Sequence, residues 1–163
     1  IKNYRVDSNR IYLTGMSSGA NMVIEYAGSS VERAKRVAAI SVPALCSVPD
    51  TVTNIERGIK PAHIGQANLP VWFMQCEGDP NCGLRIPQGW ANGIEQAGGV
   101  APRLTVLDTL DGTNASSAVL CAGWRHDTWF RMYDPNFAET PNMYDWFIQY
   151  TRDSADTSIS KLK

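Results

Sequence analysis

The stretch that decides the fold reads Arg10-Ile11-Tyr12-Leu13-Thr14-Gly15-Met16-Ser17-Ser18-Gly19. A short apolar run leads into Gly-x-Ser-x-Gly, and a helix-compatible stretch, residues 20–27, follows at once. This order of strand, sharp turn and helix is the context in which a serine is held at the apex of a strained turn. We therefore expect Ser17 at the apex, with its hydroxyl clear of the sheet. Gly15 and Gly19 would lack side chains because the strand and the helix approach closely there.

Apolar runs and helical patterns alternate along the rest of the chain. After a polar bridge at residues 29–35, the sequence predicts strands at residues 36–42, 69–76 and 103–108 and helices at residues 88–96 and 142–152. Residues 44–68 contain Pro49 and Pro61, and we expect them to be loop-rich. Strands that alternate with helices predict the α/β class, with a mostly parallel sheet covered by helices on both faces.

Size and composition limit the possible functions. The chain has 163 residues, of which 44% are hydrophobic and 19% charged, and this describes one globular domain with a real core. The formal net charge is −1 and the sequence shows no dense Lys/Arg cluster. Nucleic acid and anionic membranes are therefore not expected as partners, and the sequence contains no apolar stretch of membrane-spanning length.

The four cysteines are Cys46, Cys76, Cys82 and Cys121. Their spacing lacks the paired Cys-x-x-Cys rhythm of a zinc site, so we expect no metal. An even count allows two disulfides in any of three connectivities, and buried free thiols are the alternative. Cys76 and Cys82 flank Asp79, so a disulfide could brace the loop that carries this acid. At least one disulfide is the favoured interpretation, and it predicts a secreted or periplasmic protein.

Three polar residues follow expected strands at positions where they could act together. Ser17 follows the first strand, Asp79 follows the third, and His126 lies in the loop beyond the fourth. Ligands of open α/β sheets bind at the carboxyl ends of the strands. A nucleophilic serine needs a base within hydrogen-bond reach, and that base needs a carboxylate to fix its tautomer. The order Ser, Asp, His is the one expected for α/β-hydrolases, so the sequence predicts a triad of these three residues.

Other assignments compete with this triad. Glu77, Asp108 and Asp111 are alternative acids, and Asp79 could merely begin a turn. His126 could belong to an aromatic cluster that seals the sheet edge, whereas His63 is expected to be a surface or loop-packing residue. Ser18 could replace Ser17 only if the register of the turn were different.

Four ordered blocks of the chain resemble secreted esterases related to polyhydroxybutyrate depolymerases and feruloyl esterases. The blocks are residues 9–22 around Ser17, residues 69–72 leading to the Asp79 turn, residues 126–129 and residues 144–147. By this resemblance the fold is an α/β-hydrolase fold and the triad is Ser17, Asp79 and His126. The chain departs from the family where Gln75-Cys76 replaces a usual His-Gly pair, and its loop at residues 111–123 is longer than typical.

The resemblance also implies that several strands and a helix precede the Ser17 strand, and that one oxyanion donor comes from a loop among them. The backbone N–H of Ser18 would supply the other donor. We therefore expect residues 1–163 to be the C-terminal portion of one catalytic domain, with the N-terminal remainder of that domain as its partner. This remainder would also cover an open sheet edge.

The expected reaction is hydrolysis of a carboxylic ester through an acyl-enzyme, without a metal or another cofactor. Trp124, Trp129 and Trp90 could form an aromatic platform for sugars or phenolic acids, or they could be packing residues. The favoured substrate is a small or polymeric ester linked to a carbohydrate or a phenolic acid, and a short polyester or an acyl peptide comes second. A serine peptidase on the same fold and a non-catalytic carbohydrate-binding or assembly module are the alternatives.

Overall fold

The core of the molecule is a four-stranded sheet whose strands are all parallel. The structure is a computed structural model that describes residues 4–48, 55–107, 125–136 and 141–152. The strands are β1 (Tyr12–Thr14), β2 (Ala39–Pro43), β3 (Val71–Cys76) and β4 (Arg103–Leu107), in the sheet order β1-β2-β3-β4. The register places Phe73 between Val42 on one side and Leu104 on the other. The prediction of a parallel α/β sheet is confirmed.

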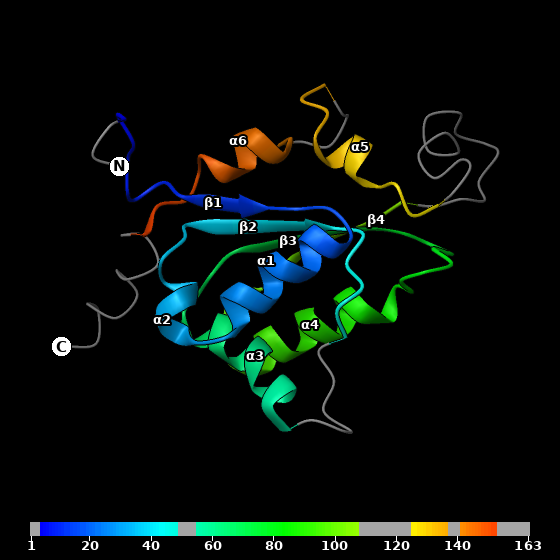
Figure 1. Ribbon diagram of the computed structural model, residues 1–163, viewed down its shortest axis with the longest axis horizontal. Coiled ribbons are helices and arrows are strands. Elements are labelled where there is room, and N and C mark those ends of the chain that lie inside the picture. Colours follow the sequence, from blue (N-terminus) through cyan, green and yellow to red (C-terminus); the bar gives the residue numbers. More distant parts are fainter. Residues whose placement is uncertain (1–3, 49–54, 108–124, 137–140, 153–163) are drawn as a thin grey trace.

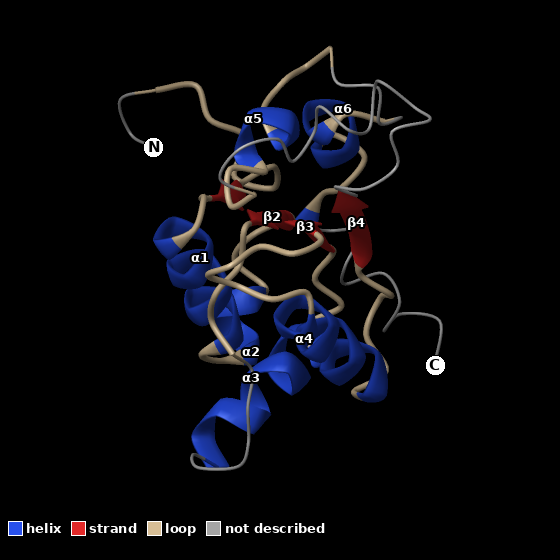
Figure 2. Cartoon of the chain, turned by 90° about the vertical axis from the view of Figure 1, so that its right-hand side faces the viewer, coloured by secondary structure: helices blue, strands red, loops and turns tan. Residues whose placement is uncertain are grey.

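Helices cover both faces of this sheet, but they are unequally shared. The helices are α1 (Ser18–Gly28), α2 (Val31–Ala34), α3 (Ile55–Gln66), α4 (Arg85–Gln96), α5 (Trp129–Met132) and α6 (Met143–Phe147). The connecting helices α1 to α4 lie on one face, and α5 and α6 lie on the other (Figures 1 and 2). Right-handed crossovers between strands that follow one another across a sheet place every connecting helix on the same face. The second face is therefore covered by the segment that follows β4.

The two faces of β3 feed two separate cores. All six residues of β3 are buried. Val71 and Phe73 pack with apolar residues of α1, α3 and α4, whereas Trp72 and Met74 pack with Met132, Trp146 and Phe147 of α5 and α6. A continuous apolar run is what a strand needs when both of its faces are covered.

The predicted loop at residues 44–68 is wrong in its second half, because α3 occupies it. Pro61 lies inside this helix, where it has no N–H to donate and disfavours a helix. Close packing against α4 compensates for this loss: a Cβ built on Gly93 would lie 2.7 Å from the Cβ of Pro61. Tertiary contact, which local sequence does not show, therefore decided the structure of this segment.

Smaller differences concern the ends of elements. The polar bridge at residues 29–35 contains α2, and the strand expected from residue 36 begins at Ala39. The last helix, expected to run to residue 152, ends at Phe147. The short helix α5 was not predicted. The longest helices in the described ranges have 12 residues, and none of them is long and apolar enough to cross a membrane.

Candidate active site

Ser17 occupies a strained turn between β1 and α1. Its backbone has φ 51° and ψ −115°, a conformation that non-glycine residues rarely adopt and that costs about 1–3 kcal/mol. The backbone N–H of Ser17 donates to the carbonyl of Pro43, at the end of β2, over 3.3 Å. The neighbouring strand therefore helps to hold the turn, and the prediction of a sharp strand-to-helix turn at Ser17 is confirmed.

The close approach of the strand and the helix depends on Gly15 alone. A Cβ at Gly15 would lie 2.6 Å from both the backbone carbon and the backbone oxygen of Gly19. A Cβ at Gly19 would meet no atom of the described residues within 4 Å. The expectation is thus confirmed for Gly15 and wrong for Gly19, because Gly19 contributes its backbone to the contact while its own missing side chain points into open space.

We expect Gly15→Ala to destabilise the protein and Gly19→Ala to leave it at least as stable. The first substitution forces a methyl group into backbone that cannot rotate away, and overpacking of this kind costs about 1–3 kcal/mol. The second replaces a helical glycine by a better helix former, which is worth up to about 1 kcal/mol. Thermal unfolding of the two variants measures the difference. Equal melting temperatures for both variants would contradict the contact at Gly15.

His126 lies between Ser17 and Asp79 and contacts both. Its Nδ1 lies 2.8 Å from Oδ2 of Asp79, and its Nε2 lies 2.8 Å from Oγ of Ser17. A carboxylate can only accept hydrogen bonds, so Nδ1 carries the proton in this contact. Nε2 of a neutral ring is then an acceptor for the Ser17 hydroxyl, and this is the arrangement in which a histidine can take a proton from a serine.

Thr128 fixes the loop that carries His126 to the sheet, and Trp129 packs against the ring. The Thr128 hydroxyl, which is fully buried, donates to the carbonyl of Met74 in β3 over 3.3 Å. The Trp129 ring meets the His126 ring edge-on, with centroids 5.7 Å apart. His126 itself is only 4% exposed, so water has little access to the ring.

Both carboxylate oxygens of Asp79 are held by donors. Oδ1 accepts the backbone N–H groups of Asn81 and Cys82, over 2.8 and 3.0 Å. Oδ2 accepts a hydrogen bond from the His126 ring N–H and a second one, over 2.7 Å, from Nε2 of Gln75. The Asp79 side chain has no exposed area, and the four donors that converge on it offset the loss of water around this buried carboxyl group.

A disulfide between Cys46 and Cys82 closes the loop that carries Asp79. It links the segment after β2 to the segment after β3, with Cα atoms 4.8 Å apart. On the side of Cys46, the Asn21 side chain of α1 accepts the backbone N–H groups of Cys46 and Ser47, over 2.9 and 2.8 Å. The helix that begins after Ser17 and the loop of Asp79 are thereby tied to the same short segment.

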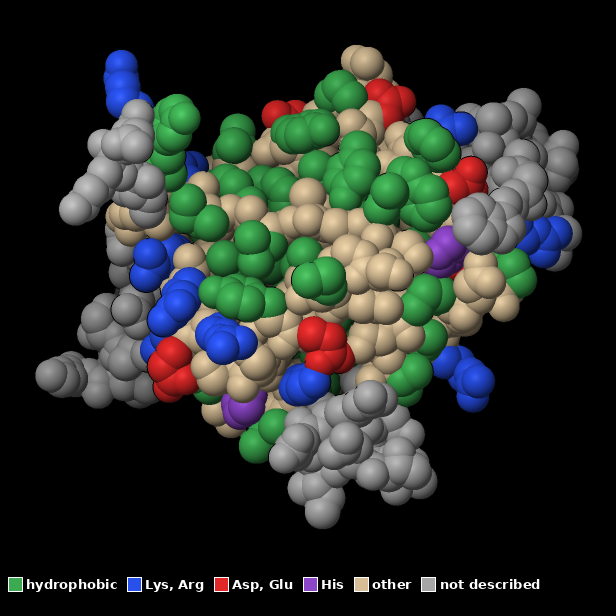
Figure 3. Space-filling model, in the orientation of Figure 1, with side chains coloured by type: hydrophobic (Ala, Val, Ile, Leu, Met, Phe, Trp, Pro, Cys, Tyr) green, Lys and Arg blue, Asp and Glu red, His purple; other side chains and the backbone are tan. Residues whose placement is uncertain are grey.

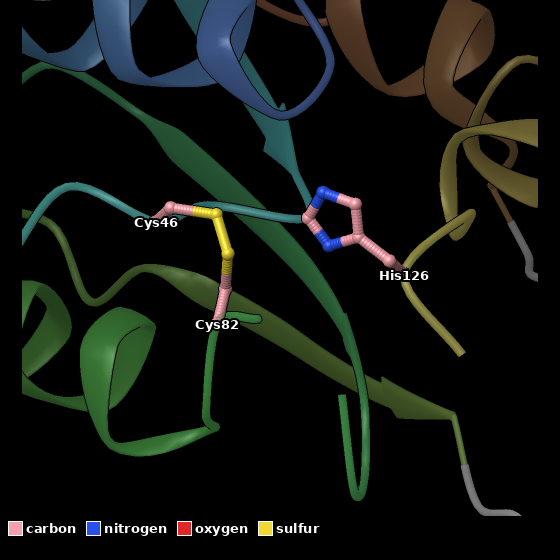
Figure 4. Close-up of side chains that lie close together, drawn as sticks. All are labelled: Cys46, Cys82 and His126. Atoms are coloured by element: carbon pink, nitrogen blue, oxygen red, sulfur yellow. A yellow bond between two sulfur atoms is a disulfide. The ribbon is translucent and has the colours of Figure 1, made fainter. Parts of the chain in front are cut away.

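The disulfide also lies beside His126, as Figure 4 shows. The Sγ atoms of Cys46 and Cys82 and a ring nitrogen of His126 lie within 4.8 Å of one another, a grouping that resembles a metal site. Sulfurs joined in a disulfide are not thiolates, and the ring nitrogens already contact Asp79 and Ser17. We therefore assign this grouping to the support of the histidine and not to a metal.

Removing the disulfide by the double substitution Cys46→Ser and Cys82→Ser is expected to lower the free energy of unfolding by about 2–4 kcal/mol. The two cysteines are 36 residues apart, and closing a loop of this size restricts the unfolded chain by about that amount. Turnover of an ester should fall as well, because the Cys82 N–H donates to Asp79. Denaturant unfolding with and without a reductant measures the first effect. A denaturant unfolding curve that is the same with and without the reductant would contradict this prediction.

The other candidate residues from the sequence lie partly beside the site, partly in the core and partly outside the described residues. Trp129 is half-buried beside His126, whereas Trp90 is fully buried and donates to the Ser47 carbonyl over 2.6 Å, so it is a core residue. Ser18 is the first residue of α1, so its N–H is among those without a partner inside the helix. His63 contacts the Gly28 carbonyl from α3 and serves packing. Trp124, Cys121, Asp108 and Asp111 lie outside the described residues, and Glu77 is exposed.

Sequence reasoning missed two residues of this region, Gln75 and Asn21. Gln75 had a detectable signal, since it is a polar residue in an otherwise apolar strand that ends at the acid loop. The partners of Asn21 are backbone groups about 25 residues away, and local sequence does not reveal such contacts.

A chain of hydroxyl groups begins at Thr14, the last residue of β1 before the turn of Ser17. The Thr14 hydroxyl contacts the hydroxyls of Ser41 and Tyr133, over 2.8 and 3.0 Å. Burial raises the pKa of Tyr133, and the hydrogen bond between Tyr133 and Thr14 opposes this rise. Tyr133 is therefore a neutral phenol at physiological pH, and the chain of hydroxyls joins β1, β2 and the turn after α5 without adding charge to the site.

Comparison with known proteins gives structural likeness without sequence likeness. No protein-family model and no curated protein sequence matches the chain. Among solved structures, a thermostable esterase superposes with a TM-score of 0.61 at 19% identity, over 92% of this chain and 33% of its own. A protein of Klebsiella pneumoniae subsp. pneumoniae MGH 78578 assigned as a dienelactone hydrolase gives 0.53 at 17%, over 88% of this chain and 54% of its own.

A peptidase shares the same architecture. The acylaminoacyl peptidase of Pyrococcus horikoshii superposes with a TM-score of 0.50 at 15% identity, over 85% of this chain and 25% of its own. Identities this low establish a common fold and do not establish a common substrate. The chain has the α/β-hydrolase fold and spans about a third of the length of the thermostable esterase.

Proposed function

We propose that the protein is a serine hydrolase that cleaves carboxylic esters. One observation carries this proposal: His126 contacts Oγ of Ser17 through Nε2 and the carboxylate of Asp79 through Nδ1, each over 2.8 Å. Ser17 would attack the carbonyl carbon while His126 takes its proton and later gives it to the leaving alcohol. Asp79 would hold the ring in the required tautomer and stabilise the imidazolium. Water would then cleave the acyl-enzyme by the same steps.

The oxyanion that forms on the substrate needs donors near Ser17. The backbone N–H of Ser18 would be one such donor. It lies at the start of α1, where N–H groups lack helical partners and the helix dipole favours negative charge. A second donor is worth about 10²–10³ in turnover. In related folds it comes from a loop that precedes the serine strand, and we propose the same source here.

We further propose that a preceding segment of the same polypeptide covers the open side of β1. In the described part of the chain β1 pairs only with β2, and an apolar groove of about 380 Å³ lies next to it. Its lining includes Ile11, Leu13, Met22, Val23 and Tyr26, and Met22 is 75% exposed. Hydrophobic side chains gather on the face of the molecule that Figure 3 shows. The solved esterase, of which this chain spans 33%, supports a larger domain. Hydrogen exchange on the whole protein tests this, since β1 amides that face away from β2 would be protected only if another strand pairs there.

We favour an ester of the kind cleaved by feruloyl esterases and polyhydroxybutyrate depolymerases, because four blocks of the sequence resemble those enzymes and Trp129 stands beside His126. A small or polymeric substrate carrying a phenolic acid or a sugar would suit an aromatic side chain. The structural likeness to an acylaminoacyl peptidase supports amide cleavage as the second candidate. The disulfide between Cys46 and Cys82 supports a secreted or periplasmic location.

A fluorophosphonate tests the proposed function directly. Such a reagent forms a covalent bond only with an activated serine, so the whole protein should gain the mass of one adduct, and peptide mapping should place it on Ser17. Hydrolysis of an aryl ester and of the matching aryl amide then separates esterase from peptidase. A protein of full mass that forms no adduct would favour the non-catalytic module.

A further inference from the structure

The strand β3 buries one polar side chain, Gln75, among apolar neighbours. Gln75 is fully buried, and it precedes the acid Asp79 by four residues. A buried amide without partners is costly, so its hydrogen bonds must offset the loss of water. These bonds all lie within the loops that support the site.

The amide of Gln75 uses both of its ends. Its Oε1 accepts the backbone N–H of Leu45 over 3.1 Å. Its Nε2 donates to Oδ2 of Asp79 and to the carbonyl of Cys82, over 2.7 Å in each case. The orientation of the amide is determined by these partners, because a flipped amide would face two acceptors with an oxygen and one N–H with a nitrogen.

Gln75 and His126 donate to the same oxygen of Asp79. The carboxylate can turn about its terminal bond, and two N–H donors on Oδ1 and two on Oδ2 together leave it one orientation. The donors on Oδ1 come from the acid loop itself, whereas Gln75 belongs to the rigid strand β3. Gln75 therefore links Asp79 to the sheet by a hydrogen bond. Through its bond with Leu45, it also links Asp79 to the segment that carries Cys46.

We infer that Gln75 is a positioning residue for the Asp79–His126 pair. This inference rests on the proposed function and deepens it. Without the amide, Asp79 would lose one of the two donors on the oxygen that orients the His126 ring, and the ring would be held in the correct tautomer for a smaller fraction of the time. The chemical step should suffer and substrate binding should not, because Gln75 is buried behind the acid.

The first test is Gln75→Met, which keeps the length of the side chain and removes its amide. We expect kcat for an aryl ester to fall about tenfold to hundredfold, the range found when groups that hydrogen-bond and orient a metal-binding histidine are removed, with KM within about twofold. Thr105→Val is the matched control, because it breaks another buried hydrogen bond of the sheet, from Nε1 of Trp72, without contact to Asp79. It should lose stability and keep kcat.

The second test is Gln75→Glu, which separates positioning from a merely structural role. Two carboxyl groups this close cannot both ionise easily, so they share one proton at lower pH. A protonated introduced carboxyl can donate to Oδ2 of Asp79 as the amide does, whereas an ionised one repels it. We therefore expect the kcat of Gln75→Glu to exceed that of Gln75→Met on the low-pH side of the pH profile. As the pH rises, the kcat of Gln75→Glu should fall about tenfold or more below that of the original protein.

These results are distinguishable from a failure of the proposed function. If the original protein binds no fluorophosphonate, the proposed function fails, and no variant of Gln75 is needed to show it. If it reacts, and a folded Gln75→Met protein keeps kcat within about twofold, the positioning role is wrong. If Gln75→Met does not fold, an unshifted pH profile for Gln75→Glu overturns the inference.

Discussion

Replacing Ser17 by alanine is expected to lower kcat for an activated ester by about 10⁶-fold and to leave the fold intact. The Ser17 side chain is half-buried and its hydroxyl contacts the ring of His126, so its loss opens no large cavity. Initial rates with an aryl ester, together with fluorophosphonate labelling, measure the effect.

His126→Ala should cost about as much as Ser17→Ala, and the double variant should cost no more than either alone. Residues that act as one unit lose their effect together, since a serine without its base is as inactive as a base without its serine. The control is His63→Ala, which removes the other of the two histidines together with its contact to the Gly28 carbonyl, away from Ser17 and Asp79. Near-normal turnover in His126→Ala, or losses that multiply in the double variant, would contradict the assignment.

Asp79→Asn is expected to lower kcat by about 10⁴-fold while the protein keeps its shape. Both oxygens of Asp79 accept two N–H groups each, so an amide must place its own N–H₂ against two donors in either orientation. On the Oδ2 side, the conflict with His126 is relieved when the ring changes tautomer and its Nδ1 becomes an acceptor, while Gln75 still donates to the same position. Nε2 of His126 then carries the proton and cannot take one from Ser17.

The comparison with Glu77→Gln identifies the acid. Glu77 lies two residues from Asp79, is exposed and was a competing candidate in the sequence. Its substitution should leave kcat within about twofold, because a solvated carboxylate outside the contact chain has no hold on the His126 ring. Loss of turnover in Glu77→Gln together with normal turnover in Asp79→Asn would transfer the acid role to Glu77.

Much of the fold could be predicted because its signals are local. The continuous apolar run at β3 needs both faces covered, and the spacing of Met143, Trp146 and Phe147 in α6 gives one buried face. The helix α3 escaped prediction because Pro61 disfavours a helix locally. Its packing against Gly93 of α4, which the sequence places 32 positions later, supplies the missing stabilisation.

The chain by itself determined the order of strand, turn and helix at Ser17 and the succession of Ser17, Asp79 and His126 at the ends of strands. Those features follow from residue type and from the rule that parallel strands end at one edge of the sheet. Only the tertiary structure decided which groups hold the acid, that Cys46 pairs with Cys82, and that Gln75 faces Asp79. Such contacts depend on distances between segments far apart in sequence. Those distances are fixed only when the sheet has formed and the two cores have packed around it.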